Sequence, residues 1–372
     1  MNNLLDILNK SVNYLEKKNV KNPRIMAETV FSQSLGMDRI MLYANFERKL
    51  SDIEIEKIKR ILNEKILNYE VTDDIVFEKN NIAEKDKKEN LKTLIDKSVS
   101  YLEKNNIEEA KLKAEIIFSH ILSIDRMMLF TKYNDIPDFE KMDKIRNFIQ
   151  KVGKEKFPVQ YLLNEQEFYG RKFYVDKGVL IPRSDTEILV EEAVRILKEN
   201  QRQNNPKILD IGTGSGVIGI TLALEISGSK VMGTDISDKA LKIAEKNKMM
   251  LNAANIKFLK SDLFKNIEYK NFNMIISNPP YISHMETNVM SGDTLIHEPD
   301  EALFASNEGL YFYNEISEKA MEYLENEGYL LFETGYRQAE IVKKIMEKSG
   351  YKNVNIIKDM QNIERVVTGK KI

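Results

Sequence analysis

The sequence predicts an α/β protein in which a parallel, doubly wound sheet domain follows two small helical domains. After about Phe157, short strand-like runs alternate with helical stretches, a pattern typical of a parallel sheet with helices on both faces. Before that point, one stretch of the chain repeats another at a shift of 87 residues without a gap. The length of 372 residues fits several domains, because a single core rarely grows beyond ~250–300 residues.

The composition excludes several classes of protein. Lysine and arginine number 56 and aspartate and glutamate 58, so a net charge of −2 gives no general basic field for nucleic acid. Cysteine is absent and only three histidines are present, which excludes disulfides and thiol catalysis and makes a metal site unexpected. No apolar run reaches the ~18–20 residues of a membrane helix, and the N-terminal segment lacks signal-peptide character. The sequence therefore predicts a cytoplasmic protein.

The N-terminal half of the chain is a tandem duplication. Residues 10–42 and 97–129 are identical at 17 of 33 positions. Two copies are too few for a stacked repeat array. Apolar residues recur at three- and four-residue spacing, which predicts a small amphipathic helical bundle in each copy. In the first copy these residues are Val12, Leu15, Ala27, Val30, Phe31, Leu35, Met41 and Leu42.

The domain boundaries follow from changes in composition. A polar, charged segment poor in large apolar residues separates the two copies and has the composition of a linker. The expected order is helical copy 1 over residues 1–69, the linker over 70–90, helical copy 2 over 91–157, and a β-hairpin with the sheet domain over 158–372.

The hairpin and strands are expected from local patterns. Aromatic and polar residues alternate over 167–182 around Gly170, which predicts the hairpin. The strand-like runs that follow are KILDI, KVMGTDI, IKFLKSD, FNMIISN, GYLLFETG, NVNIIKD and RVVTG. Helices are expected between them, for example over 238–251 and 309–326. The last two strands have no helix between them, so one is expected to run antiparallel at the end of the sheet.

A glycine-rich loop joins the first of these strands to a helix. Gly212, Gly214 and Gly216 allow the backbone to turn tightly and to lie against a ligand. The next strand ends in Asp235, where a carboxylate can bind the vicinal hydroxyls of a ribose. Asp262 follows the third strand, where an adenine ring would lie. NAD and S-adenosylmethionine both carry an adenosine, and the loop alone favours neither strongly.

The Asn278-Pro279-Pro280-Tyr281 segment decides between these cofactors. It follows an apolar strand at the edge where doubly wound sheets bind ligands. Two prolines remove two N–H donors, so the segment presents acceptors: the Asn278 side-chain oxygen and the Pro279 carbonyl. These acceptors match the two hydrogens of a planar NH2 group, over which Tyr281 can pack. Positioning such a nitrogen against a sulfonium methyl needs no strong general base, which favours S-adenosylmethionine.

Together these motifs resemble the HemK/PrmC family, the protein-(glutamine-N5) methyltransferases that modify peptide chain release factors. The resemblance covers roughly residues 91–372 and is carried by QEFYG, GVLIPRSDTE, LDIGTGSG, TDIS, SNPPYI, EPDEAL, EGLYFY and FETGY. It implies a seven-stranded, Rossmann-like class I methyltransferase domain, preceded here by the tandemly duplicated helical domain and the β-hairpin. The implied partners are class 1 release factors, docked by the second helical copy, with no direct nucleic-acid or membrane binding.

The resemblance also implies roles for individual residues. The implied S-adenosylmethionine site consists of Gly212, Thr213, Gly214, Ser215, Gly216, Asp235, Asp262, Leu263 and Asn278. The implied clamp for the glutamine of the Gly-Gly-Gln loop consists of Asn278, Pro279, Pro280 and Tyr281, with Phe168 lining the pocket. The chain departs from the family pattern by carrying two helical domains, by Leu263 where some members have an aromatic residue, and by Ser306-Asn307 in place of Gly-Gly.

Three alternatives stay open. A ribosomal-protein glutamine methyltransferase has a similar hairpin, but it departs from the IPRxxTE pattern that residues 181–187 keep. A nucleic-acid adenine amino-methyltransferase uses the same Asn-Pro-Pro-Tyr chemistry, but it needs a basic groove and a means to extract the base. A docking module on a catalytically dead core is the third alternative, and the intact glycine loop, Asp235 and Asn278 argue against it.

Other conspicuous residues are not required by the chemistry. Methyl transfer to an amide does not need a histidine. His284 and His297, which lie near the active loop in the sequence, are therefore interpreted as residues without a catalytic role. Glu333, which ends a strand, is interpreted as structural. Arg183 and Glu187 are expected to tie the hairpin to the catalytic core through charge-assisted hydrogen bonds.

Overall fold

A computed structural model describes residues 3–18, 20, 23–37, 39–70, 89–199, 205–283 and 292–372. The chain divides into two compact units, Met1–Lys87 and Lys88–Ile372. Most of the expected linker therefore lies outside the described residues. Within the described ranges, no helix combines the length and the apolar character needed to cross a membrane.

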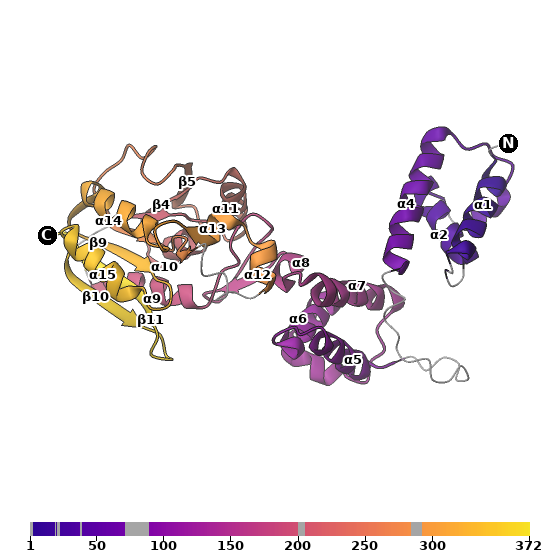
Figure 1. The fold of residues 1–372 in the computed structure, drawn as a ribbon, viewed down its shortest axis with the longest axis horizontal. Coiled ribbons are helices and arrows are strands. Elements are labelled where there is room, and N and C mark those ends of the chain that lie inside the picture. The colour runs from indigo at the N-terminus through magenta and orange to yellow at the C-terminus, as the bar shows by residue number, and fades with distance from the viewer. Residues whose placement is uncertain are drawn as a thin grey trace. The chain divides into compact units, whose positions relative to one another are not determined.

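The first unit is a helical bundle built from α1 (Leu4–Lys17), α2 (Pro23–Leu35), α3 (Arg39–Ala44) and α4 (Asp52–Glu70) (Figure 1). Asn3 caps the start of α1, where its side chain accepts a hydrogen bond from Asp6 N at 2.8 Å. The bundle core contains the predicted apolar stripe: Leu15, Ala27, Val30, Phe31 and Leu42 are fully buried, and Val12 and Leu35 pack beside them.

Met41 is the exception to the predicted stripe. Half of its surface is exposed, and the same is true of Met128 at the equivalent position of the second copy. Adjacent residues on a helix point in different directions, so Leu42 can face the core only if Met41 turns away from it. The two copies therefore share an exposed methionine as well as a buried leucine.

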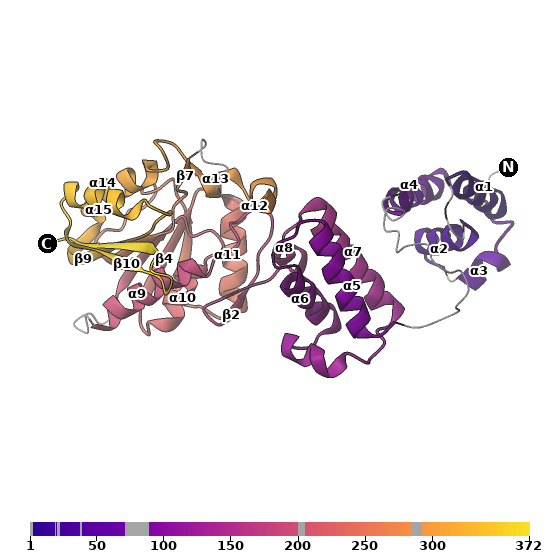
Figure 2. The same ribbon diagram turned by 60° about the horizontal axis from the view of Figure 1, so that its bottom comes forward.

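The second unit begins with a helical domain of the same plan. It contains α5 (Leu91–Lys104), α6 (Ala110–Leu122), the 3₁₀ helix η1 (Arg126–Lys132), α7 (Phe139–Glu155) and α8 (Val159–Leu163) (Figure 2). Asn90 caps α5 as Asn3 caps α1, accepting from Thr93 N at 3.0 Å. Its buried core repeats the positions of the first copy: Leu102, Ala114, Ile117, Phe118 and Leu129.

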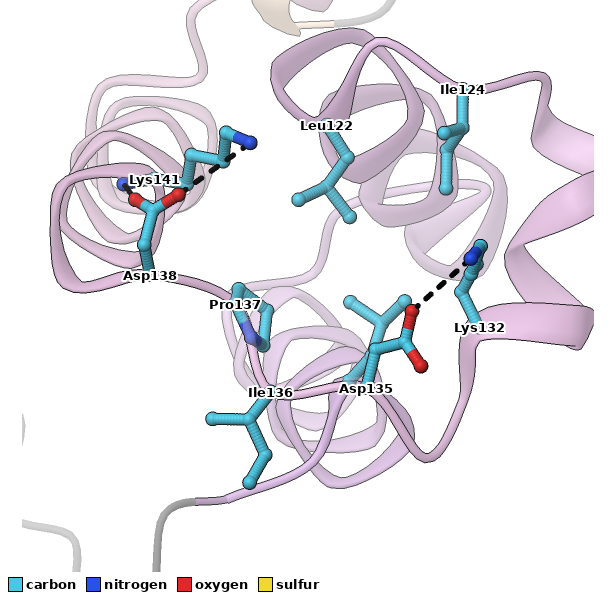
Figure 3. A pocket seen from close by; sticks show the side chains of 9 residues that line it. Leu122, Ile124, Lys132, Asp135, Ile136, Pro137, Asp138 and Lys141 are labelled. Carbon is cyan, nitrogen blue, oxygen red and sulfur yellow. Dashed lines mark hydrogen bonds and ion pairs between the residues drawn. The ribbon is translucent and has the colours of Figure 1, made fainter.

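This helical domain contains a cavity of about 330 Å³ between α5, α6 and the segment before α7. Figure 3 shows apolar side chains such as Leu122 and Ile136 together with two ion pairs, Lys132–Asp135 and Lys141–Asp138, each at 3.5 Å. Ile136 both lines the cavity and is half exposed, so the cavity opens onto the surface of the domain.

The hairpin is present and shorter than predicted. It pairs β1 (Gln166–Phe168) with β2 (Arg171–Phe173), and Tyr169 and Gly170 both have positive φ, as a two-residue type I′ turn requires. Beyond β2 the backbone has a side-chain partner instead of a strand. Asn247 accepts from Tyr174 N at 2.6 Å and donates to Tyr174 O at 2.9 Å, which ends the hairpin.

The seven predicted strands form one mixed sheet in the order β10-β11-β9-β6-β3-β4-β5. The strands are β3 (Lys207–Ile211), β4 (Lys230–Asp235), β5 (Ile256–Lys260), β6 (Phe272–Ser277), β9 (Leu324–Glu333), β10 (Lys352–Lys358) and β11 (Glu364–Lys370). The predicted antiparallel strand is confirmed as β11, but it lies between β9 and β10 and not at the edge.

Helices cover both faces of this sheet. Side chains of β3 and β6 alternate between two cores, one shared with α9 (Asp185–Glu199) and α10 (Val217–Glu225), the other with α14 (Tyr311–Tyr323) and α15 (Ala339–Lys348). Figure 2 shows the strands between these two layers of helices. The helix α11 (Asp238–Met250) confirms the expected one. The helix expected over 309–326 ends three residues earlier, because Leu324 already pairs with Phe272 of β6.

Candidate active site

The carboxyl ends of four neighbouring strands lie side by side. Ile211 at the end of β3 pairs with Thr234 of β4 on one side and with Ser277 of β6 on the other. Ser277 in turn pairs with Phe332 of β9. One residue further along each strand lies a residue from a motif identified in the sequence. In the order β4, β3, β6 and β9 across the sheet, these residues are Asp235, Gly212, Asn278 and Glu333. The edge of the sheet therefore brings the motifs together.

The glycines of the first loop have separate roles. Gly212 has φ +71°, and a side chain there would meet no atom within 4 Å, so open space lies against this part of the loop. At Gly216, a Cβ would lie 2.8 Å from Ile220 Cδ1 and 3.2 Å from Ala244 Cβ. Gly216 therefore permits close packing of α10, whereas the loop at Gly212 leaves room for a ligand against the backbone.

Asp235 is held in place by the same loop. Its Oδ2 accepts from Gly214 N and its Oδ1 from Ser237 N, both at 2.9 Å. Burial raises the pKa of Asp235, while these backbone hydrogen bonds act in the opposite direction. An ionised carboxylate has about four acceptor positions, so Asp235 keeps capacity for a hydroxyl donor such as that of a ribose. The loop and Asp235 thus fit an adenosine-bearing cofactor.

Asp210 is a site residue that the sequence reasoning missed. It is fully buried under the loop and accepts from Thr213 Oγ1 at 2.6 Å and from Gly219 N at 3.0 Å. Burial raises the pKa of Asp210 to about 7. Thr213 is buried as well, and so is Ser215. Thr213 N donates to Thr234 O and the Ser215 carbonyl accepts from Asn247 Nδ2, both at 2.8 Å, so both residues fix the loop, and their contacts with a cofactor stay predictions. The signal was an aspartate inside the apolar strand, two residues before Gly212.

The residues expected near an adenine lie beside Asp235. Ser261 N donates to Asp235 O at 3.0 Å, which ties the loop after β5 to the end of β4. Asp262 forms an ion pair with Lys265 at 2.5 Å. Leu263 has φ +49° and packs against the core shared with α14 and α15. The binding roles of Asp262 and Leu263 stay predictions.

The Asn-Pro-Pro-Tyr segment is fixed from several elements. Asn278 Nδ2 donates to Thr186 Oγ1 of α9 at 3.2 Å. The Tyr281 carbonyl accepts from Gln338 Nε2 at 3.0 Å. Burial raises the pKa of the Tyr281 hydroxyl. Pro279 is buried and Pro280 half-buried. The segment is therefore rigid enough to hold its acceptors in one place.

Two glycines make room for Tyr281. A Cβ on Gly309 would lie 2.1 Å from the Tyr281 carbonyl oxygen, and one on Gly335 would lie 2.8 Å from Cδ2 of the ring. Gly309 belongs to the EGLYFY motif and Gly335 to the FETGY motif. Their close approach explains why both motifs need a residue without a side chain.

Phe168 lies in the core. It is fully buried and packs edge-to-face on Phe173, with ring centroids 6.0 Å apart. It belongs to the core cluster under α9 and α10. Its suggested contact with a substrate glutamine stays a prediction.

The expected ties of the hairpin segment are confirmed. Glu187 accepts from Tyr169 N at 2.7 Å, which joins the hairpin turn to α9. Arg183 pairs with the buried Glu298 at 2.5 Å. His297, at the end of α12 (Gly292–His297), lies 2.8 Å from Glu155 O and so contacts the helical domain instead of the active loop. His284 lies outside the described residues.

Comparison with known proteins defines the class. Residues 186–354 match the family described as methyltransferase small domain. Residues 6–69 and 93–163 match the PrmC N-terminal domain, so both helical copies are of one family. The chain is therefore a methyltransferase with two N-terminal domains of the PrmC type.

Relatives define the particular family. A release factor glutamine methyltransferase of Fusobacterium nucleatum is 40% identical over 342 residues, covering 91% of this chain and 94% of that protein. One from Clostridium botulinum is 35% identical over 287 residues, covering 76% of this chain and 99% of that protein. The chain belongs to the release factor glutamine methyltransferase family, HemK/PrmC, as the sequence motifs predict. A solved release-factor-specific protein-(glutamine-N5) methyltransferase from Alicyclobacillus acidocaldarius is 28% identical, with a TM-score of 0.32 over 51% of this chain and 94% of that chain.

The first helical copy is not peculiar to this chain. The unit Lys88–Ile372 makes up roughly three quarters of the chain, close to the share that the Clostridium protein covers. The match to the Fusobacterium protein covers 91% of the chain, so it must extend into the first unit. At least one relative therefore has sequence that corresponds to part of the first copy.

Proposed function

We propose that this protein transfers the methyl group of S-adenosylmethionine to the side-chain amide nitrogen, N5, of the glutamine in the Gly-Gly-Gln loop of class 1 release factors. The observation that carries the proposal is the position of Asn278. It follows β6 at the edge that also carries the glycine loop and Asp235, and its NH2 group donates to Thr186. The Asn278 side-chain oxygen is then the atom left to accept from a substrate.

The residues of the first loop fit the cofactor. Open space at Gly212, the remaining acceptor capacity of Asp235 and the adjoining loop at Asp262 and Leu263 support binding of its adenosine. When bound, S-adenosylmethionine supplies an electrophilic methyl group on a sulfonium centre. Asp210 serves this site indirectly, because it holds Thr213 and Gly219 and so fixes the loop.

The Asn-Pro-Pro-Tyr segment acts on the substrate nitrogen. A glutamine NH2 group has two hydrogens, and the Asn278 Oδ1 and the Pro279 carbonyl oxygen accept one each. With both hydrogens held, the nitrogen has one orientation, and its lone pair is drawn out of conjugation with the amide carbonyl. Fixed orientation supplies a large part of the rate, so no strong base is needed, and the amide proton leaves to water after transfer.

The second helical domain supports docking of a protein substrate. It precedes the hairpin directly, and it exposes apolar side chains along η1 and the segment leading into α7: Met127, Met128, Phe130, Ile136 and Phe139. Exposed apolar surface of this kind marks protein interaction sites. We assign this surface, called the η1 surface, to the release factor.

Transfer of isotope from labelled S-adenosylmethionine tests the proposal. Purified release factor, ribosomal protein and DNA are offered separately, together with a release factor whose Gly-Gly-Gln glutamine is replaced. We expect label only in the unaltered release factor. Label in the ribosomal protein or in DNA, with none in the release factor, would contradict the proposal in favour of the corresponding alternative.

A further inference from the structure

Glu333 is a buried carboxyl group beside the active segment. It ends β9, the strand next to β6, and only 3% of its surface is exposed. Because Ser277 of β6 pairs with Phe332 of β9, the residues that follow them, Asn278 and Glu333, lie at neighbouring strand ends. Thr186 and Asn278 both lower the pKa of Glu333, as hydrogen-bond donors beside a carboxyl group do. Thr186 Oγ1 also accepts from Asn278 Nδ2 at 3.2 Å. Glu333, Thr186 and Asn278 therefore form one group where β9, α9 and β6 meet.

A purely structural role does not account for a carboxyl group at this buried position, because burying it is energetically unfavourable. Burial of an ionisable group is unfavourable unless its oxygens are paired. Among the described residues, Glu333 Oε2 has no hydrogen-bond partner. The nearby Arg365 is engaged by Asp185 and Asp359, each at 3.0 Å. A function for Glu333 beyond packing would explain why the chain tolerates this cost.

The contacts constrain the side-chain amide of Asn278. An amide can be turned by half a rotation, which exchanges its oxygen and nitrogen with little change in shape. An ionised carboxylate can only accept hydrogen bonds, so it requires the NH2 side of the amide to face it. With Nδ2 directed at Thr186 and Glu333, the Asn278 oxygen must face away from them. That is the orientation that the substrate clamp needs.

We infer that Glu333 is a positioning residue that fixes the orientation of the Asn278 amide, with Thr186 as the link between them. Glu333 does not touch the reacting atoms in this account and acts only through Asn278. The inference rests on the proposed function, because it assigns Glu333 a part in the same clamp. It replaces the interpretation of Glu333 as structural.

Kinetics of Glu333→Gln test this role at pH 8, above the raised pKa of Glu333, where the wild-type carboxyl group is ionised. Glutamine keeps the size of the side chain but adds an NH2 donor, which can satisfy the Asn278 oxygen and so stabilise the wrong orientation. We expect kcat to fall at least tenfold, with KM for release factor and affinity for S-adenosylmethionine changed less than twofold. The matched control is Glu225→Gln, because Glu225 ends α10 and pairs instead with Arg171 of the hairpin at 2.6 Å. A wild-type kcat in Glu333→Gln would overturn the inference.

A double-mutant cycle separates positioning from general structural damage. If Glu333 acts only through Asn278, then Glu333→Gln should lower kcat less than twofold in the Asn278→Ala background. The same fold loss in both backgrounds would overturn the inference. Thr186→Val tests the link from α9 should Glu333→Gln fail to fold. Thr186→Val should also lower kcat, and Thr186→Ser should restore it. Full activity in Thr186→Val would likewise count against the inference.

The wild-type substrate assay keeps this inference distinct from the proposed function. If wild type methylates ribosomal protein or DNA instead of release factor, the proposed function fails. The cycle between Glu333 and Asn278 can then be measured on that substrate, where the same coupling is expected for any NH2 group held by Asn278. Additive losses on that substrate would overturn the inference as well.

Discussion

Asn278 Nδ2 donates to Thr186 Oγ1 at 3.2 Å, which joins the end of β6 to the first turn of α9. Thr186 belongs to the IPRSDTE segment that follows the hairpin, and Asn278 to the Asn-Pro-Pro-Tyr segment nearly a hundred residues later. The two motifs therefore form one structural unit at the edge of the sheet. Within that unit, the Asn278 side-chain oxygen is the atom that can accept a hydrogen bond from a substrate.

Asp235→Ala should weaken cofactor binding. The substitution removes the acceptor that Gly214 N and Ser237 N hold in place. We expect S-adenosylmethionine binding to become less favourable by roughly 1.5–3 kcal/mol, the value typical of hydrogen bonds to a charged group. Calorimetry measures this, with NAD as the comparison ligand. Tight binding of NAD and none of S-adenosylmethionine would show that the cofactor assignment is wrong.

Substitutions on the η1 surface should weaken docking without affecting chemistry. Met128→Asp places a charge on an exposed apolar surface, so we expect KM for release factor to rise about tenfold, an effect in the range of an interface contact. The kcat should be unchanged. Met41→Asp is the matched control, because Met41 occupies the equivalent position of the first copy with the same exposure. Equal effects of the two substitutions would mean that both copies bind release factor, or that neither does so specifically.

Removal of the first helical copy should leave the chemistry intact. The glycine loop, Asp235 and Asn278 all belong to the unit Lys88–Ile372, which is compact by itself. A protein that begins near Lys87 should therefore stay folded and methylate release factor with a similar maximal rate. The comparison is kcat and KM of this protein and of the full chain. If the shortened protein binds S-adenosylmethionine but does not methylate, the first copy is part of substrate docking.

Glu333 should make stability depend on pH. Burial raises the pKa of Glu333 to about 7, Asp185 acts in the same direction, and Thr186, Arg365 and Asn278 oppose it. The pKa in the folded state therefore exceeds that of the unfolded chain. Protonated Glu333 therefore favours the folded state. This stabilisation is fully present below about pH 4 and is lost as the pH rises through about 7.

Glu333→Gln removes this dependence, so it should raise the free energy of unfolding at pH 8 by roughly 1–3 kcal/mol over wild type. The advantage should shrink at pH 5. Denaturant unfolding at both pH values measures the difference, with Glu225→Gln as the control. A variant that is less stable than wild type at pH 8 would show that the buried carboxylate is well compensated.

The sequence was most informative where local pattern decides structure. Apolar runs between turn residues identified all seven strands, and the glycine loop, Asp235 and Asn278 lie at the expected edge of the sheet. Contacts between distant side chains could not be foreseen. Asp210 under Thr213 and Gln338 on the Tyr281 carbonyl depend on how separate elements meet in space.

Two differences between expectation and structure have the same origin. The hairpin ends early because Asn247, more than 70 residues away, takes over the backbone of Tyr174. The antiparallel strand β11 lies inside the edge because it pairs with β9 as well as with β10. In both cases a partner from another part of the chain decides where an element ends or lies. Local sequence does not contain that partner.

The most direct test of the central claim is mass analysis of the Gly-Gly-Gln peptide of release factor after incubation with S-adenosylmethionine and either wild type or Asn278→Ala. We expect wild type to add one methyl group to the glutamine side chain. The Asn278→Ala protein should bind the cofactor normally yet turn over at least ~100-fold more slowly, a loss of about 2.7 kcal/mol of transition-state stabilisation. Methylation of that glutamine by Asn278→Ala at the wild-type rate, or no methylation of it by wild type, would contradict the account.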